Sequence, residues 1–166
     1  MTKYSPLGHA TLSAEFAGGR LNGDVKYTRS LLNTDFRIPS GRDAAFGLKL
    51  FAGFSNQRLP LHKRFEFGGI GMLPGYRYKE FGGDRAFLIH GEYLFGSERF
   101  RLVPFVGAGA AWSHDQRFDA DLVKYNAGIG VEVGEGRDRV RIDFARPVGE
   151  GERTTWEKHL LFLRSR

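Results

Sequence analysis

The chain contains no cysteine, and this absence excludes three kinds of site. With 0 cysteines among 166 residues, it has no disulfide, no thiolate metal ligand and no thiol nucleophile. Long hydrophobic runs are also missing, since no stretch approaches the ~18 consecutive apolar residues that a membrane helix needs. A helical membrane protein is therefore excluded. A transmembrane β-barrel is not, because its strands alternate apolar and polar residues and average to a polar hydropathy.

Two further absences concern charge clustering and export. The net charge is +6, from 25 basic and 19 acidic residues, but the charges are scattered. No block of lysine and arginine resembles a nucleic-acid-binding arm, so we expect no nucleic-acid partner. Polar residues follow Met1 and no apolar h-region is present, so the chain as given is expected to carry no signal peptide. An exported location would then make it a mature form or part of a longer protein.

Glycine and aromatic residues are plentiful. The chain has 23 glycines in 166 residues, about twice the average usage of about 7%, and 14% aromatic residues. Helical periodicity is absent, while apolar and polar residues alternate with period two. This pattern predicts an all-β chain of eight strands, several of them near the length that crosses a bilayer when tilted. The expected strands are residues 8–18, 21–32, 44–55, 85–96, 100–113, 122–133, 139–146 and 155–164.

The two faces of these strands differ in charge. One face is almost free of charge at the strand centres, and a charge facing lipid costs about 2–4 kcal/mol at the bilayer midplane. We therefore expect the apolar face to contact lipid and the charged face to line a lumen. The lipid-facing set includes Leu12, Tyr27, Leu31, Leu48, Ile89, Ile129 and Ile142, and the lumen set includes Glu92, Lys124, Arg141 and Asp143. Glycines on the polar face, such as Gly128 and Gly130, are interpreted as positions that let the wall curve.

The predicted fold is an eight-stranded antiparallel up-and-down transmembrane β-barrel in one domain, residues 1–166. Half of a sixteen-stranded barrel shared by two chains is the other arrangement, and we favour the closed monomer because it satisfies its own edges. The side chains of eight strands fill such a barrel, so a long loop would have to stay above it. A soluble barrel with the apolar face inside is the alternative fold.

One connection is unusually long. Residues 33–43 form a moderate connection, whereas residues 56–84 separate the third strand from the fourth. A loop beyond about 15 residues in a compact domain is usually functional or disordered. This one contains Phe65, Phe67 and Tyr76, and its aromatic residues indicate that it packs.

The segment 64–83 resembles the inward-folded loop of the BamA/TamA-type outer-membrane assembly and secretion family, the bacterial surface antigen barrel. The loop of that family has a Gly-Gly pair, then Val/Leu-Arg-Gly-Phe/Tyr, then a strand that bears a glutamate. Residues 141–147 resemble the family's penultimate strand and residues 156–163 its closing strand. The corresponding positions of the signature loop are Gly68, Gly69, Leu73, Pro74, Gly75, Tyr76 and Arg77.

The resemblance implies where these residues act. The loop is the third surface loop of the last eight strands of a sixteen-stranded barrel in that family, and here it is the third connection of eight. The glutamate position matches Glu92, and we expect Arg141 and Asp143 to be its partners in the lumen. We also expect residues 68–76 to fold against the lumen wall near Glu92, with Tyr76 packed and Gly75 at a position that a side chain would disturb.

Two positions depart from the family pattern. Position 74 is proline where the family has arginine at the loop tip, and position 107 is glycine where the family has aspartate. Loss of both members of a buried pair avoids an uncompensated charge. Arg77 is a candidate to replace the missing guanidinium.

The resemblance implies a non-enzymatic domain of the outer membrane of a Gram-negative bacterium, acting as a membrane anchor or as a pore or insertase module. Its expected partners are outer-membrane lipid, client outer-membrane proteins and a second copy of the chain. The alternatives are a soluble lipocalin-like carrier of small molecules, and the barrel anchor of an upstream lipase-type enzyme. No histidine spacing fits a metal site, and we expect no catalytic residue, no metal and no cofactor.

Overall fold

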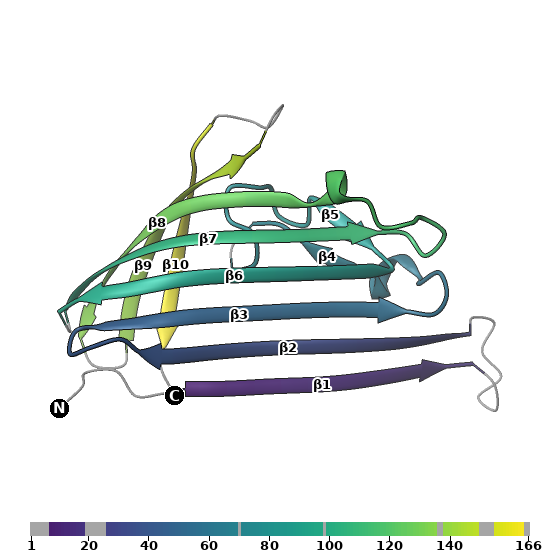
Figure 1. The fold of residues 1–166 in the computed structure, drawn as a ribbon, viewed down its shortest axis with the longest axis horizontal. Helices are drawn as coiled ribbons and strands as arrows, with labels where there is room; N and C mark the ends of the chain where they lie inside the picture. Colours follow the sequence, from purple (N-terminus) through teal and green to yellow (C-terminus); the bar gives the residue numbers. More distant parts are fainter. Residues whose placement is uncertain are drawn as a thin grey trace.

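Eight long strands form one antiparallel sheet in the order of the sequence (Figure 1). The computed structural model describes residues 7–18, 26–69, 71–97, 99–135, 138–149 and 155–164. Each strand pairs with its neighbour along the chain, apart from two short strands inserted between the third and fourth long ones. The long strands are β1 (Leu7–Ala17), β2 (Tyr27–Pro39), β3 (Ala44–Ser55), β6 (Arg85–Gly96), β7 (Phe100–Trp112), β8 (Lys124–Glu135), β9 (Asp138–Val148) and β10 (Glu157–Arg164).

Short elements complete the described chain. The strands β4 (Phe65–Phe67) and β5 (Phe81–Gly83) pair as a separate hairpin within the long loop. Single turns of 3₁₀-helix, η2 (Leu61–Lys63) and η3 (Ala120–Leu122), precede β4 and β8. Among the described residues no helix is long and apolar enough to cross a membrane. The all-β prediction is confirmed.

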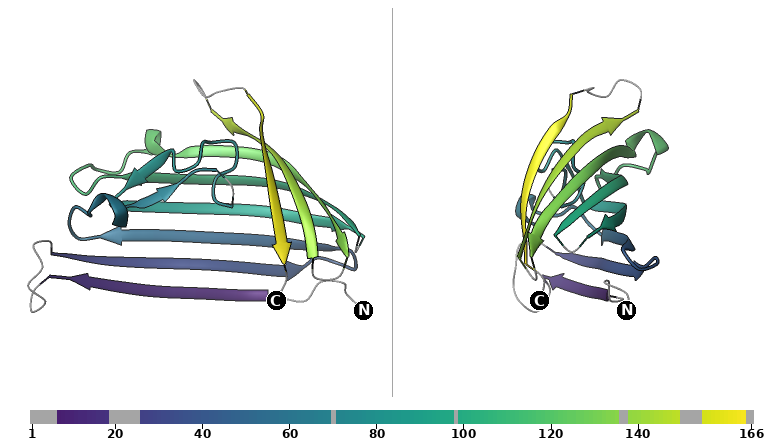
Figure 2. Two further views of the ribbon diagram at one scale, coloured as in Figure 1. Left: turned by 180° about the vertical axis from the view of Figure 1, so that it is seen from behind. Right: turned by 90° about the vertical axis from the view of Figure 1, so that its left-hand side faces the viewer.

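The sheet is open, which corrects the expectation of a closed monomeric barrel. It bends strongly, so that β9 and β10 turn across one end of the flatter part formed by β1, β2, β3, β6 and β7, and β8 curves between the two parts (Figure 2). Within the described residues, β1 pairs only with β2 and β10 only with β9, so both are edge strands. The long loop lies on the concave side of this wall, where a closed eight-stranded barrel would have only wall side chains.

The second strand is shifted from its predicted position. It was expected at residues 21–32, but the described strand runs from Tyr27 to Pro39 and takes in most of the expected 33–43 connection. Its face assignment was also wrong. Leu32, Phe36 and Ile38 are the exposed apolar residues of β2, while Tyr27 is buried and Leu31 is partly buried against the concave-side core. Asn33 and Asp35 alternate with Leu32, Thr34 and Phe36 of the other face, so the strand continues through residues that we expected to form a connection.

At their centres the other long strands place apolar side chains outside and charges inside, whereas Arg85, Arg146 and Lys158 lie on the outer face near strand ends. Leu12 is 78% exposed and Ile89 is 48% exposed, whereas Glu92 is 5% exposed. Leu48, Ile129 and Ile142 are likewise exposed, and Arg141 and Asp143 are buried. This distribution is the reverse of a soluble carrier barrel, whose apolar side chains would face the interior.

Because the chain has no cysteine, single spin labels can test the two faces directly. Labels at Leu48 and Ile89 of the protein in detergent micelles should collide with dissolved oxygen, which concentrates in apolar surroundings. A label at Lys49, the neighbour of Leu48 on the other face of β3, should collide more with a water-soluble nickel complex. The opposite preference at Leu48 and Lys49 would invert the assignment of the faces.

Candidate functional site: the docked loop and the buried charges

The base of the long loop is held by a buried aspartate. Asp84 is 0% exposed and precedes β6. Its Oδ1 accepts the backbone N–H of Leu59 at 2.9 Å, and its Oδ2 accepts that of His114 at 2.9 Å. One carboxylate therefore joins both ends of the loop to the connection after β7. We did not identify Asp84 from the sequence. Its position between a Gly-Gly pair and a strand is the signal that could have pointed to it.

The first part of the loop is attached to the first two strands. Lys63 Nζ lies 2.6 Å from Glu15 Oε1 on β1, and Tyr27 on β2 donates its hydroxyl to the same oxygen at 2.9 Å. The hydrogen bond to Glu15 raises the pKa of Lys63. Arg29 Nε donates to the Lys63 carbonyl at 3.1 Å. These contacts tie the loop to the β1 side of the sheet.

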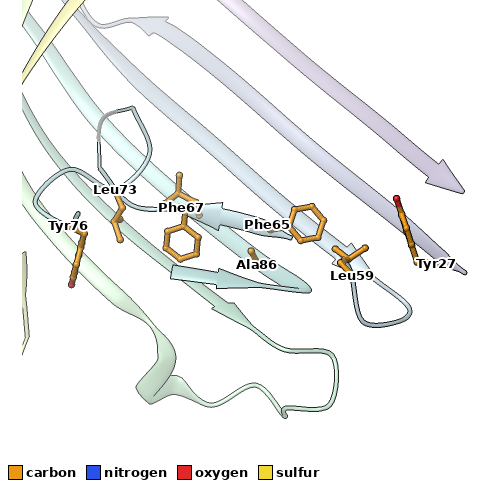
Figure 3. Close-up of a cluster of buried hydrophobic side chains, with 8 residues drawn as sticks. Tyr27, Leu59, Phe65, Phe67, Leu73, Tyr76 and Ala86 are labelled. Carbon is orange, nitrogen blue, oxygen red and sulfur yellow. The ribbon is translucent and has the colours of Figure 1, made fainter. Parts of the chain in front are cut away.

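The middle of the loop packs its large side chains onto glycines of the wall. A Cβ on Gly53 would lie 2.5 Å from the Phe65 ring, and one on Gly109 would lie 3.2 Å from the Phe67 ring. Both rings are almost completely buried and belong to the cluster of buried hydrophobic side chains in Figure 3. The space left by each missing side chain therefore holds an aromatic ring of the loop.

The tip of the loop reaches across to the last strands. Leu73 and Tyr76 are buried, and both lie in the same cluster (Figure 3). Asn126 Nδ2 on β8 donates to the Pro74 carbonyl at 2.6 Å. The Tyr76 hydroxyl donates to the Tyr125 carbonyl at 3.0 Å. Asn126, like Asp84, was not among the residues we identified, because its role depends on the loop backbone and not on a motif.

Gly75 is the closest approach between the loop and the wall. Its φ is +96°, and a Cβ there would lie 2.8–3.0 Å from backbone atoms of Arg146 on β9. The Gly75 N–H also donates to His159 Nε2 on β10 at 3.3 Å. Both the backbone conformation and the lack of space therefore require glycine. The Gly68–Gly69 pair has positive φ at both positions and begins the turn toward the tip.

Arg77 does not occupy the lumen, which corrects its suggested role as a replacement guanidinium. It is exposed, and its backbone N–H donates to Glu80 Oε2 at 2.6 Å. The partner of Glu92 is instead Arg141 on β9, whose Nη1 lies 2.8 Å from Glu92 Oε2. The guanidinium that Glu92 contacts thus comes from the wall and not from the loop.

Arg141 is the centre of a buried group of charges. Its Nε donates to Asp143 Oδ1 at 2.6 Å, and its Nη1 lies 3.5 Å from Glu132 Oε1. Glu132 also faces Arg101, with 3.7 Å between Oε2 and Nη1. The structure therefore brings together Glu92, Arg141 and Asp143, and adds Glu132 and Arg101.

Wall glycines make room for this group. A Cβ on Gly47 would lie 2.6 Å from Glu92 Cγ, and one on Gly130 would lie 2.8 Å from Arg141 Nε and closer still to Asp143 Oδ1. We interpreted the polar-face glycines as sites of curvature. In the structure, Gly47 and Gly130 also provide the volume that the buried charged side chains occupy.

The loop tip and the charges are neighbours on the wall. A Cβ on Gly107 would contact Asn126 Oδ1, Leu73 Cδ1 at 3.3 Å and His90 Nδ1 at 3.4 Å. His90 Nε2 in turn lies 3.8 Å from Glu92 Oε2. Position 107 therefore joins the Pro74 contact to the Glu92–Arg141 pair. The departures at positions 74 and 107 fall at one place in the structure.

This arrangement binds the long loop. Glu92, Arg141 and Asp143 are engaged with one another, and Asn126 Nδ2 is engaged with the loop backbone. His90 Nδ1 and Asn126 Oδ1 are buried without a hydrogen-bond partner among the described residues. No group of three or more His, Asp or Glu in this part of the chain could hold a metal ion. What the site can do is hold residues 56–84 within the concavity of an open sheet.

Comparison with known families identifies a relationship over nearly the whole sheet. The model described as the Omp85 superfamily domain matches residues 9–160. The match therefore begins in β1 and ends in β10. No curated protein matches the sequence.

Gly75→Ala should loosen the tip of the loop, because the new Cβ would meet the Arg146 backbone. Trypsin cleavage at Arg77 and Lys79 of the protein in micelles should become severalfold faster. Gly71→Ala is the matched control, since Gly71 has a φ of +80° but open space where its Cβ would lie. Equal cleavage rates in the two variants would mean that the contact with β9 does not hold the loop.

Arg141→Gln should lower the free energy of unfolding by about 3–5 kcal/mol, because it leaves Glu92 and Asp143 buried without their cation. Lys79→Gln is the control: it leaves Glu66, its partner at 2.6 Å, on the surface, and should cost at most about 1 kcal/mol. Denaturant unfolding from micelles measures both. Adding Glu92→Gln and Asp143→Asn to Arg141→Gln should recover part of the loss. A loss in Arg141→Gln no larger than the control's would contradict a buried charge group.

Proposed function

Because the chain belongs to the Omp85 superfamily, we propose that it is a β-barrel module of the bacterial outer membrane that takes part in inserting or translocating other proteins. Its convex apolar face contacts outer-membrane lipid, and its client is an unfolded outer-membrane protein. The docked loop is the working part of the concave face. The superfamily is one of outer-membrane barrels for protein insertion and translocation, and the all-β fold agrees with it.

The observation that carries this proposal is the loop docked in the concavity of an open sheet. With the loop in place, β1 and β10 remain edge strands within the described residues. An unpaired strand edge is a template for another strand. A module that offers strand edges beside an apolar outer face is suited to guide the strands of a client into the membrane.

A second copy of the chain is the partner that we propose for the edges at rest. In an even-numbered up-and-down sheet the first and last strands run in opposite directions, so β1 of one copy can pair with β10 of another. Twofold symmetry, the commonest in homo-oligomers, would repeat this pairing and close sixteen strands. Such a barrel would have room for both loops.

The proposed activity can be measured as the folding rate of a client. The protein is reconstituted in phosphatidylcholine vesicles. The client, an eight-stranded outer-membrane protein unfolded in urea, is then added. Its folding, followed by the mobility shift of folded barrels in electrophoresis, should be severalfold faster than with empty vesicles. Gly75→Ala should reduce the gain, whereas Gly71→Ala should retain it. Equal rates with and without the protein would overturn the insertion role.

A membrane anchor is the second candidate function, and the loop tip supports it. Pro74 presents no charge to the wall, and its carbonyl is already bound by Asn126. A loop held in this way could simply fill and stabilise a barrel that carries another domain, such as a lipase-type enzyme. Stable insertion into vesicles without any effect on client folding is the result that would favour the anchor.

A further inference from the structure

Three neighbouring side chains form a row at the end of the sheet that carries the long loop. In the sheet register Phe54 on β3 is opposite Arg85 on β6, and Arg85 is opposite Trp112 on β7. Arg85 Cζ lies 4.9 Å from the centroid of the Phe54 ring. Phe54 is 51% exposed on the convex face. Trp112 lies on the same face of β7 as Val106, which is 62% exposed, because the two lie an even number of positions apart along the strand. One cation thus lies between two aromatic residues at the border of the apolar surface.

More aromatic side chains extend this row. Phe118, in the connection after β7, lies 5.3 Å from Trp112 and 6.0 Å from Phe87 between ring centroids. Phe118 is 51% exposed. Transmembrane β-barrels carry girdles of aromatic side chains where the membrane's hydrocarbon meets its headgroups. The row has the composition and the position of such a border.

Arg85 lacks an acidic partner in this place. Its Nη2 lies 3.4 Å from His114 Nδ1, and no carboxylate of the described residues forms an ion pair with it. The adjacent Asp84 carboxylate is engaged by Leu59, His114 and Arg64. Arg85 Nε and Trp112 Nε1 are shielded from water and have no hydrogen-bond partner among the described residues. Protein atoms enclose these two donors, whereas Arg85 Nη1 is not among the shielded atoms and has no partner among the described residues. This side of the guanidinium can take an anionic acceptor.

We propose that Arg85 and His114, beside Trp112, bind the phosphate group of an anionic membrane lipid. The acyl chains of the lipid then lie along the aromatic side chains of Phe54 and Phe118. This inference rests on the proposed position of the convex face in a membrane. A guanidinium matches the geometry of a phosphate, and cations at the membrane surface attract anionic lipids.

Trp112 itself reports on the site. The chain has 2 tryptophans, so Trp156→Phe leaves Trp112 as the only one. The protein with this substitution is reconstituted in two sets of vesicles. One set contains brominated phosphatidylglycerol and the other brominated phosphatidylcholine, and the two sets contain equal amounts of bromine. Arg85→Gln is compared with Arg146→Gln. The latter removes another arginine of the outer face, since Arg146 is exposed on the same side of β9 as Ile142.

Brominated phosphatidylglycerol should quench Trp112 more strongly than brominated phosphatidylcholine. Arg85→Gln should abolish this excess, and Arg146→Gln should retain it. About 1 M salt should remove the excess from the protein with native Arg85, since the Debye length falls to about 3 Å. If Arg85→Gln fails to insert, this salt dependence tests the lipid site in its place.

Two results separate the failure of this inference from that of the proposed function. Equal quenching by the two lipids, or an excess that survives Arg85→Gln or high salt, would overturn the lipid site while leaving the membrane position intact. No quenching by either lipid would overturn the membrane position and the lipid site together.

Discussion

The packing of loop side chains onto glycines of the sheet is the constraint on which the rest of the structure depends. Phe65 lies over Gly53 and Phe67 over Gly109, in space that a side chain of the wall would otherwise take. Leu73 shares the space at Gly107 with Asn126 and His90 of the wall. The loop therefore replaces wall side chains as the filling of the concave face. A wall that curves around such a filling cannot close with eight strands, because the interior of an eight-stranded barrel holds little more than its own side chains.

The buried charges near the loop tip likewise occupy space that glycines of the wall leave free. Glycines at positions 47 and 130 leave room for Glu92, Arg141 and Asp143, which pair with one another across β6 and β9. A buried ion pair is costly to break but is weak evidence for net stability. Its effect here is to fix how β9 lies against β6 where the sheet bends. The loop tip then contacts the same bend through Pro74 and Gly75.

The sequence predicted most of the sheet because period two records which face of a strand is apolar. Strands β3 and β6 begin and end where the alternation placed them. Strand β2 was misplaced because Leu31 and Leu32 are adjacent, so two registers fit the pattern, and only pairing with β1 and β3 selects one. Asp84 and Asn126 could not be identified for a related reason. Their partners are backbone atoms far away in the chain, which no local pattern specifies. The resemblance predicted where the loop lies. Which guanidinium contacts Glu92, that of Arg77 or that of Arg141, depends on how β9 crosses the bend of the sheet.

The position of the loop is tested most directly by a disulfide between the loop tip and the wall. Pro74→Cys and Asn126→Cys introduce thiols at two residues whose polar atoms are 2.6 Å apart. Ser13→Cys with Leu31→Cys, which are opposite one another on β1 and β2, is the control for a folded sheet. In membrane vesicles, mild oxidation should form the bond within one chain in both pairs, as mass spectrometry of the tryptic peptides would show. A bond in the strand pair without one between positions 74 and 126 would contradict the docked loop.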